Sequence, residues 1–182
     1  MSLLHLGPSE GRSVVFWGLG TTFKVLSETI GGSLGVVEHT LEPGWLGAPP
    51  HRHAREDETS YVLEGKLTVE QEGEVTTAGP GEYILKPRGI FHTFWNAGTE
   101  RVRFIEMISP GGFEHYFEEL APFFPPNVPD PDFQAAAAVA AKYALEFDRS
   151  RVDELLAKYN LTAGRSPVRA TSTPSGGQAP QP

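Results

Sequence analysis

Three histidines and one glutamate are spaced so that they could hold a single metal ion. His51 and His53 lie two positions apart, and in an extended segment alternate side chains share a face, so both imidazoles can point the same way. Glu58 opens the next predicted strand after a short polar turn, and His92 follows a Pro-Arg-Gly sequence that suits a reverse turn. Together they make a ligand set for one divalent transition metal.

The chemistry of such a site depends on its open coordination positions. The ion could be Mn, Fe, Co, Ni, Cu or Zn, because these ligand types do not select among them. Four protein ligands leave about two positions free on an octahedral ion, which a substrate oxygen or dioxygen could fill. The competing interpretation is a degenerate site without metal, because a single histidine in a β protein is more often a surface or hydrogen-bonded residue. The other histidines, His5, His39 and His115, lie outside the pattern and receive no metal role.

The elements that must position these residues are short strands. Runs rich in β-branched and aromatic residues, separated by glycine and proline, occupy residues 13–109. They predict strands at Ser13–Trp17, Phe23–Thr29, Leu34–Leu41, Thr59–Leu63, Lys66–Gln71, Glu74–Thr77, Glu82–Leu85, Phe91–Trp95 and Arg101–Ile108. Gly65 and Gly73 fall in two-residue connections typical of hairpins. Many short strands without helices between them indicate an antiparallel all-β domain, either a sandwich or a barrel.

The pattern changes to helical spacing after residue 109. Apolar residues predict helices over Phe113–Leu120, Phe133–Phe147 and Val152–Tyr159. We expect this extension, residues 110–161, to pack on the outside of the β domain of residues 1–109 or on a partner subunit. Residues 162–182 are rich in Thr, Ser, Pro, Gly, Gln and Ala, which predicts a disordered tail.

Composition excludes several classes of protein. The chain has 182 residues, 39% of them hydrophobic, which suits one globular domain with a core. It has no cysteine, so disulfides, thiolate metal sites and cysteine nucleophiles are excluded. The net charge of −8 argues against a nucleic-acid partner. No apolar run reaches membrane-spanning length and the start lacks a signal-peptide pattern, so we expect a cytoplasmic protein with no membrane association.

The first group of ligands resembles the first signature motif of the cupin superfamily. That motif is glycine, five residues, His-x-His, three or four residues, Glu, six residues and glycine. His51, His53, Glu58 and Gly65 fit it, whereas Trp45 stands where the leading glycine is expected. We interpret the difference as a one-residue change in a loop, which leaves the ligands in place.

The second group resembles the second cupin motif, which is glycine, five residues, Pro-x-Gly, two residues, His, three residues and Asn. Every position is matched, by Gly81, Pro87, Gly89, His92 and Asn96. The resemblance implies a double-stranded β-helix, the jelly-roll cupin barrel, to which the short C-terminal helices are added. It also implies that the three motif histidines and the glutamate bind the metal, while the glycines, the proline and the asparagine shape turns.

Within that superfamily, the Pro-Pro-His-x-His sequence and the following Pro-Gly-Gly-Phe-Glu segment resemble the quercetin-dioxygenase-like group. Enzymes of that group bind an enolate-type substrate on a metal held by three histidines and a glutamate, and direct dioxygen onto it. The resemblance implies that Glu58 is also catalytic, as the acceptor of a substrate proton. The alternation along the strands predicts that Ser60, Val62 and Phe94 line the pocket. The expected function is a metal-dependent dioxygenase on a small aromatic or enol-type compound.

Two other functions stay open. One is a metal-dependent isomerase, lyase or hydrolase, in which the ion acts only as a Lewis acid. The other is a non-enzymatic cupin that binds a small ligand or serves as a structural partner. Many small cupins pair through their sheets, so the resemblance also implies a homodimer.

Overall fold

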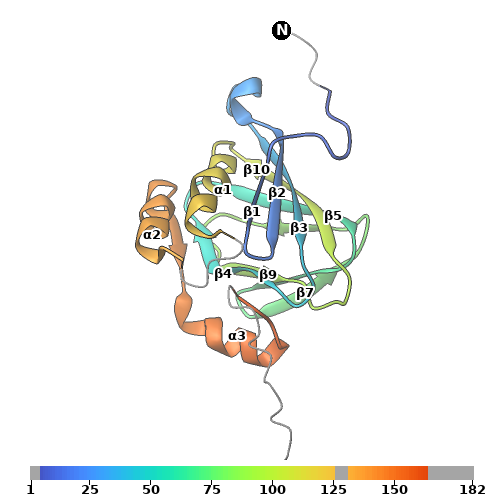
Figure 1. Ribbon diagram of the computed structural model, residues 1–182, viewed down its shortest axis with the longest axis vertical. Coiled ribbons are helices and arrows are strands. Elements are labelled where there is room, and N and C mark those ends of the chain that lie inside the picture. Colours follow the sequence, from blue (N-terminus) through green and yellow to red (C-terminus); the bar gives the residue numbers. More distant parts are fainter. Residues whose placement is uncertain (1–4, 126–130, 164–182) are drawn as a thin grey trace, which may run out of the picture.

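Two antiparallel sheets make up most of the protein. The computed structural model describes residues 5–125 and 131–163. In them the strands are β1 (Ser13–Phe16), β2 (Leu19–Val25), β3 (Gly35–Leu41), β4 (Leu46–His53), β5 (Asp57–Glu64), β6 (Leu67–Gln71), β7 (Glu74–Ala78), β8 (Tyr83–Lys86), β9 (His92–Trp95), β10 (Val102–Ser109) and β11 (Leu145–Phe147). One sheet has the order β1-β2-β3-β10-β5-β8 and the other β11-β4-β9-β6-β7, the two-layer arrangement of a jelly roll (Figure 1).

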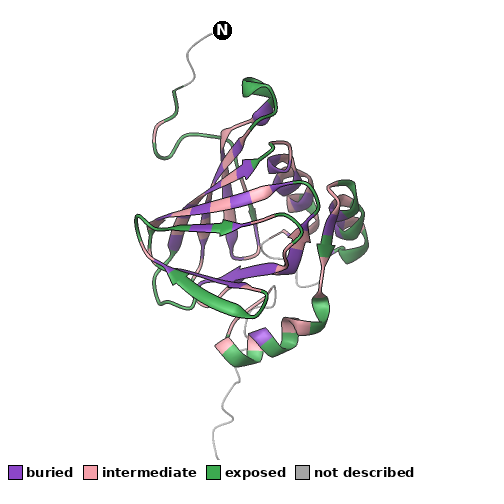
Figure 2. Cartoon of the chain, turned by 180° about the vertical axis from the view of Figure 1, so that it is seen from behind, coloured by how far each residue is buried: buried purple, intermediate pink, exposed green. Residues whose placement is uncertain are grey.

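The larger sheet has one face turned to the interior. Along β3 and β10 buried positions alternate with partly buried ones, as the two-residue period of a strand requires (Figure 2). The register places Val37 opposite Glu106 and His39 opposite Phe104, so polar and apolar side chains share this inner face. On the other side of β10, Ser60 lies opposite Glu106. The sheet therefore brings polar side chains from several strands into the interior.

Short helices lie outside the two sheets (Figure 1). They are η1 (Ser27–Ile30), α1 (Glu114–Leu120), η2 (Ala121–Phe123), α2 (Phe133–Lys142), η3 (Arg149–Arg151) and α3 (Val152–Tyr159). In Figure 1, α1 and α2 lie beside β1 and β4 rather than between the sheets. Phe113, Phe117 and Leu120 belong to the main hydrophobic core, so α1 is an integral part of the fold. In the described residues no helix has the length and apolarity needed to cross a membrane.

The predicted helix over Phe133–Phe147 is wrong in its second half. The helix ends at Lys142, and Ala144 takes a left-handed backbone conformation with φ of 52°, which breaks the helical path. Leu145–Phe147 then forms β11, which pairs with β4 at the edge of the smaller sheet. Apolar spacing suited a helix here, but pairing with an open sheet edge satisfies the backbone of this segment instead.

Three other predictions need correction or fall outside the described residues. The predicted strand Phe23–Thr29 is displaced, because β2 runs from Leu19 to Val25 and Ser27–Ile30 is a 3-10 turn. The segment that carries the His-x-His pair belongs to a full strand, β4. Of the predicted tail, Thr162 forms a bridge with Trp45, and residues 164–182 lie outside the described part of the chain.

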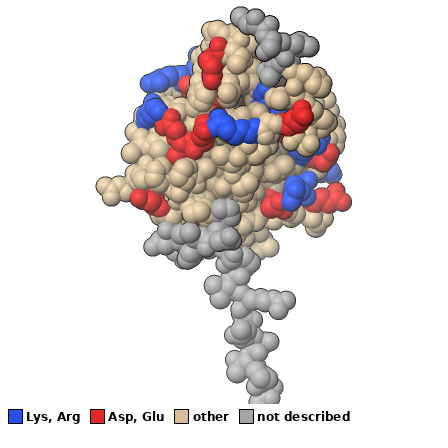
Figure 3. All heavy atoms as spheres, turned by 45° about the horizontal axis from the view of Figure 1, so that its top comes forward, with Lys and Arg blue, Asp and Glu red and all other residues tan. Residues whose placement is uncertain are grey.

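Charges of both signs are mixed on the surface. In the view of Figure 3, acidic and basic side chains lie close to one another, without a patch of one sign over that face. Ion pairs account for part of this mixing, among them Arg12 with Glu118 and Arg101 with Glu42.

Candidate metal centre

The two halves of the ligand set meet because β4 and β9 are neighbours in the smaller sheet. The register places His51 directly opposite His92. The turn before β9 is tied to β4 as well, since Gly89 donates a backbone hydrogen bond of 2.7 Å to the carbonyl of His53. Gly89 has a φ of 78°, a conformation that glycine adopts without strain. The backbone hydrogen bond of Gly89, a residue of the second motif, therefore holds the second motif against the first.

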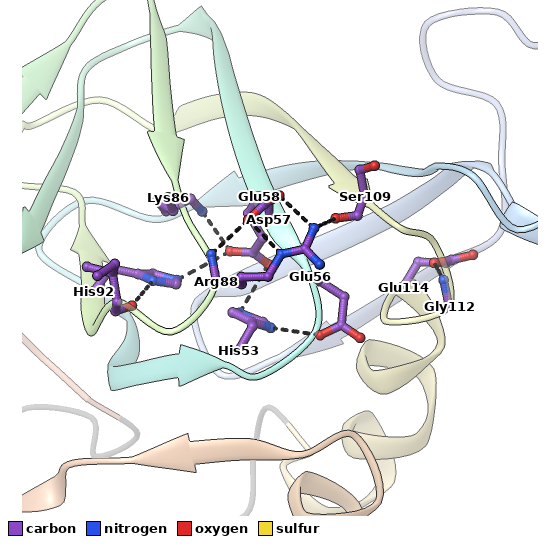
Figure 4. Close-up of polar contacts among 11 residues, drawn as sticks. His53, Glu56, Asp57, Glu58, Lys86, Arg88, His92, Ser109, Gly112 and Glu114 are labelled. Carbon is purple, nitrogen blue, oxygen red and sulfur yellow. Dashed lines mark hydrogen bonds and ion pairs between the residues drawn. The ribbon is translucent and has the colours of Figure 1, made fainter.

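The four predicted ligands converge in the interior. His51, His53, Glu58 and His92 are all buried, and a ligand atom from each lies within 4.8 Å of the others. The rings of His51 and His92 are 4.3 Å apart between centroids. Figure 4 shows His53 and His92 pointing toward Glu58, which comes from β5 in the opposite sheet. This is the set of nitrogen and oxygen donors that a divalent transition metal requires.

Hydrogen bonds to the backbone orient two of the imidazoles. Nδ1 of His51 lies 2.8 Å from the carbonyl oxygen of Pro49, and Nδ1 of His92 lies 3.2 Å from that of Ile90. Because a carbonyl only accepts, these contacts place the proton on Nδ1 and leave the lone pair on Nε2. Such bonds commonly orient histidines that bind metals.

Buried nitrogens without a partner show that the residues fit a metal. Among the described residues, Nε2 of His92 and both ring nitrogens of His53 are buried and form no hydrogen bond. Buried polar atoms are rarely left in this state, because the desolvation of each one costs free energy. A cation shared by these nitrogens and Glu58 would satisfy them.

The protonation states suit ligation. Burial lowers the pKa of His51 well below its usual value, and the neighbouring His92 and His53 lower it further. Burial also lowers the pKa of His53 to about 4, although Glu58 acts in the opposite direction. Burial alone would raise the pKa of Glu58, but Lys86 and then His53 outweigh it and hold that pKa well below its usual value. At neutral pH these groups are therefore neutral imidazoles and a carboxylate, the forms that bind metal.

A buried lysine joins the site to a second carboxylate. Nζ of Lys86 lies 3.0 Å from Oε2 of Glu58 (Figure 4). It also lies 2.6 Å from Oε2 of Glu106, and all three side chains are buried. Ser60 donates a further hydrogen bond of 2.9 Å to Oε2 of Glu106. Burial acts to lower the pKa of Lys86, but Glu106 and Glu58 outweigh it and raise that pKa. The protonated lysine thus pairs with two buried carboxyl groups, of which Glu106 has a pKa that burial raises to about 7.

Two more residues lie beside His53. The ring of Phe113 packs edge-on against it with 4.4 Å between centroids, and Oε2 of Glu56 lies 3.8 Å from its Nδ1. Glu56 Oε2 is buried and has no hydrogen-bond partner among the described residues. A small adjustment would let Nδ1 donate to this carboxylate, the contact that often orients a metal-binding histidine.

A cavity of about 620 Å³ opens beside the metal ligands. His51, Glu58, Glu106 and His39 contribute polar groups to it. Much of its wall is aromatic, from Phe16, Trp17, Phe94, Phe113, Tyr116, Phe117, Phe124, Phe133 and Phe147. Several of these come from the helical extension, which therefore forms part of the binding cavity. A cavity with apolar walls and a few convergent polar groups is the usual form of a small-molecule site.

The predicted pocket residues have different positions. Phe94 lies on the cavity wall, whereas Ser60 and Val62 are not among the residues that line it. Both point inward from β5, but Ser60 is bound to Glu106 and Val62 is fully buried in the hydrophobic core. Alternation gave the correct face of the strand, and the neighbouring side chains decide which residues on that face reach the cavity.

Sequence reasoning missed Lys86, Glu106, Glu56 and Phe113. One signal was present for Glu106, since it lies between Phe104 and Ile108 at every second position of a strand and must share their inward face. A charged residue at such a position usually has a partner or a functional role.

Comparison with known proteins agrees with this geometry. The Cupin_2 family, described as a cupin domain, matches residues 37–108. Germin-like protein subfamily T member 2 of Arabidopsis thaliana is 36% identical over 85 residues, covering 42% of this chain and 36% of that protein. Quercetin 2,3-dioxygenase of Bacillus subtilis is 27% identical over 99 residues, covering 54% of this chain and 26% of that protein. The chain thus matches about a quarter to a third of the length of these relatives.

A solved structure shows the same fold. KdgF from Halomonas sp. aligns with a TM-score of 0.52 and 25% identity, covering 59% of this chain and 94% of that chain. Both cupin motifs, the two-sheet fold and the family match coincide in one segment of the sequence. Residues 37–108 are therefore a cupin domain.

Proposed function

We propose that this chain is a metal-dependent dioxygenase that acts on a small aromatic or enol-type compound. The observation that carries the proposal is the opening of the His51, His53, Glu58 and His92 cluster into an apolar, largely aromatic cavity. The partial similarity to quercetin 2,3-dioxygenase supports the reaction class. A divalent ion at this cluster would supply Lewis-acid polarisation of a substrate hydroxyl group.

The protein's own residues would perform the remaining tasks. The aromatic wall would hold a planar substrate against the cluster and exclude water from it. Glu58 would accept the proton of the substrate hydroxyl group, and Lys86 keeps its carboxylate ionised and ready to do so. The hydrogen bonds from the imidazoles of His51 and His92 to backbone carbonyls would keep those two ligands in place during turnover.

Oxygen uptake tests the proposal. The purified chain is reconstituted separately with Mn, Fe, Co, Ni and Cu, and oxygen consumption is followed with quercetin or acetylacetone as substrate. We expect substrate-dependent uptake with at least one metal, its loss in His92→Ala, and its retention in His115→Ala, a histidine outside the cluster. Absence of uptake with every metal would contradict a dioxygenase. Turnover of substrate by the zinc form under nitrogen would instead assign Lewis-acid chemistry.

We also propose that the chain forms a homodimer through the exposed face of its larger sheet. On the edge strand β8, Tyr83 and Leu85 are 66% and 59% exposed, an unusual position for two large apolar side chains. Tyr61 on the neighbouring strand extends this surface, with its ring 4.6 Å from that of Tyr83. Light scattering should give twice the chain mass for the wild type and a monomer for Leu85→Glu. A wild-type monomer would refute the proposal.

A further inference from the structure

One carboxylate oxygen beside the metal centre has no partner. Oε1 of Glu106 is buried and accepts no hydrogen bond from any described residue, whereas Oε2 accepts from both Lys86 and Ser60. Glu106 belongs to the wall of the cavity. A buried carboxylate oxygen left unpaired is costly, because its desolvation is not compensated. This acceptor therefore needs a donor that the described residues do not supply, and a molecule that occupies the cavity could supply it.

A second acceptor lines the same cavity. His39 is buried on β3, and its Nδ1 lies 3.0 Å from Oγ1 of Thr21 and 3.4 Å from the carbonyl oxygen of Gly20. The carbonyl can only accept, so this contact places the proton on Nδ1. Burial lowers the pKa of His39 to about 4, which keeps the ring neutral. The nitrogen that remains, Nε2, is an acceptor.

The sheet register sets these two acceptors beside the metal ligands. Glu106 and His39 point inward from the neighbouring strands β10 and β3, two residues apart in the register, because Glu106 lies opposite Val37. Glu106 is linked to Glu58 through a single lysine, with contacts of 2.6 and 3.0 Å. The rings of Phe104 and Phe117 pack against the imidazole of His39. The acceptors therefore lie where they could reach a substituent next to the metal-binding atoms of an aromatic ligand.

We propose that Glu106 and His39 form a recognition pair for a hydroxyl group of the substrate adjacent to the oxygens that bind the metal, in which Glu106 accepts the hydrogen bond and His39 is the alternative acceptor. The inference rests on the proposed function and specifies its substrate class as aromatic compounds with three neighbouring oxygen functions, the third of which carries a proton. Methylation of that third oxygen keeps the metal-binding pair but removes the donor. It leaves Glu106 Oε1 unpaired, and sites built to bind a hydroxyl group reject such analogues strongly.

Two small probes isolate this contact. Pyrogallol and 3-methoxycatechol share a catechol that can bind the metal, and only pyrogallol has the third hydroxyl group. Calorimetry at pH 8 under nitrogen, with the nickel-loaded full chain, measures the affinity for each probe without oxidation of the ligand. We expect the wild type to bind pyrogallol roughly tenfold to a hundredfold more tightly than 3-methoxycatechol.

A single substitution should invert the preference. In Glu106→Gln the amide oxygen must stay at the position of Oε2, because Lys86 and Ser60 both donate to it. The amide NH₂ then replaces Oε1 and becomes a donor to the cavity. This variant should bind 3-methoxycatechol at least as tightly as pyrogallol. Glu70→Gln is the matched control, a buried carboxylate that pairs with Arg151 outside the cavity, and it should keep the wild-type preference.

The outcomes separate the inference from the proposed function. Equal affinity of the wild type for both probes, or an unchanged preference in Glu106→Gln, would overturn the recognition pair and leave the metal centre intact. If neither probe binds wild-type protein with a full complement of nickel, both the recognition pair and the proposed function are overturned. If Glu106→Gln does not fold, His39→Phe is the second test, because it removes the second acceptor. This variant should show a reduced preference for pyrogallol, and an unchanged preference in His39→Phe would refute the recognition pair.

Discussion

Lys86 should be the most sensitive residue in the interior of this protein. Its side chain is 1% exposed and bridges two buried carboxylates, at 3.0 Å from Glu58 and 2.6 Å from Glu106. Lys86→Met preserves most of the volume but leaves both carboxylates without their cation. Removal of one partner of a buried ion pair costs about 3–5 kcal/mol. In a domain of this size that corresponds to a fall of about 6–20 °C in Tm.

The assay is thermal unfolding of the metal-free protein at pH 8, beside Lys142→Met as the control. Lys142 pairs with Glu119, but its side chain is 61% exposed, so its loss should cost no more than about 1 kcal/mol. Addition of nickel should recover part of the loss in Lys86→Met, because the bound cation replaces the missing charge near Glu58. If metal-free Lys86→Met loses no more in Tm than Lys142→Met does, relative to the wild type, the reasoning is refuted.

Three further outcomes follow from other parts of the structure. Chelation of the metal from loaded wild-type protein should lower the free energy of unfolding, by about 4 kcal/mol if the free metal was at a thousand times its Kd. Asn96→Ala should cost about 2–3 kcal/mol in denaturant unfolding, since Asn96 is fully buried and donates to two backbone carbonyls. Burial acts to raise the pKa of Glu114, but hydrogen bonds from Ser27 and Gly112 outweigh it and hold that pKa below its usual value. The ionised Glu114 carboxylate thus stabilises the protein above the pKa that it has in the unfolded chain, and this stabilisation is lost as the pH falls through the pKa that it has in the folded protein. Glu114→Gln should therefore destabilise the protein at pH 7 and much less at pH 3, as measured by urea unfolding at the two pH values.

The cluster of His51, His53, Glu58 and His92 could be predicted because the positions of these residues depend largely on local geometry. A two-residue spacing in an extended segment fixes the relative direction of His51 and His53, and a glycine turn sets the start of the strand that carries His92. These features need no knowledge of the tertiary fold. The contact between the two motifs, made by Gly89, follows once the strands are paired.

The surroundings of the ligands could not be predicted in the same way. The approach of Lys86 to Glu58 and Glu106 depends on the pairing of β5 with both β8 and β10, which a single sequence does not reveal. The segment Leu145–Phe147 has helical apolar spacing, yet an open edge of the smaller sheet recruits it as a strand. Phe113 comes from beyond the β domain and reaches His53 only because α1 folds back onto the sheets. Each of these outcomes is decided by tertiary pairing rather than by local propensity.

The metal content of the purified chain tests the central claim most directly. Elemental analysis after reconstitution compares the wild type with His92→Ala, which removes a ligand, and His39→Phe, which removes a buried histidine outside the ligand set. The structure predicts about one divalent ion per chain in the wild type and in His39→Phe, and a large loss in His92→Ala. Wild-type protein without metal after reconstitution, or a metal content that His92→Ala leaves unchanged, would contradict the assignment of this site.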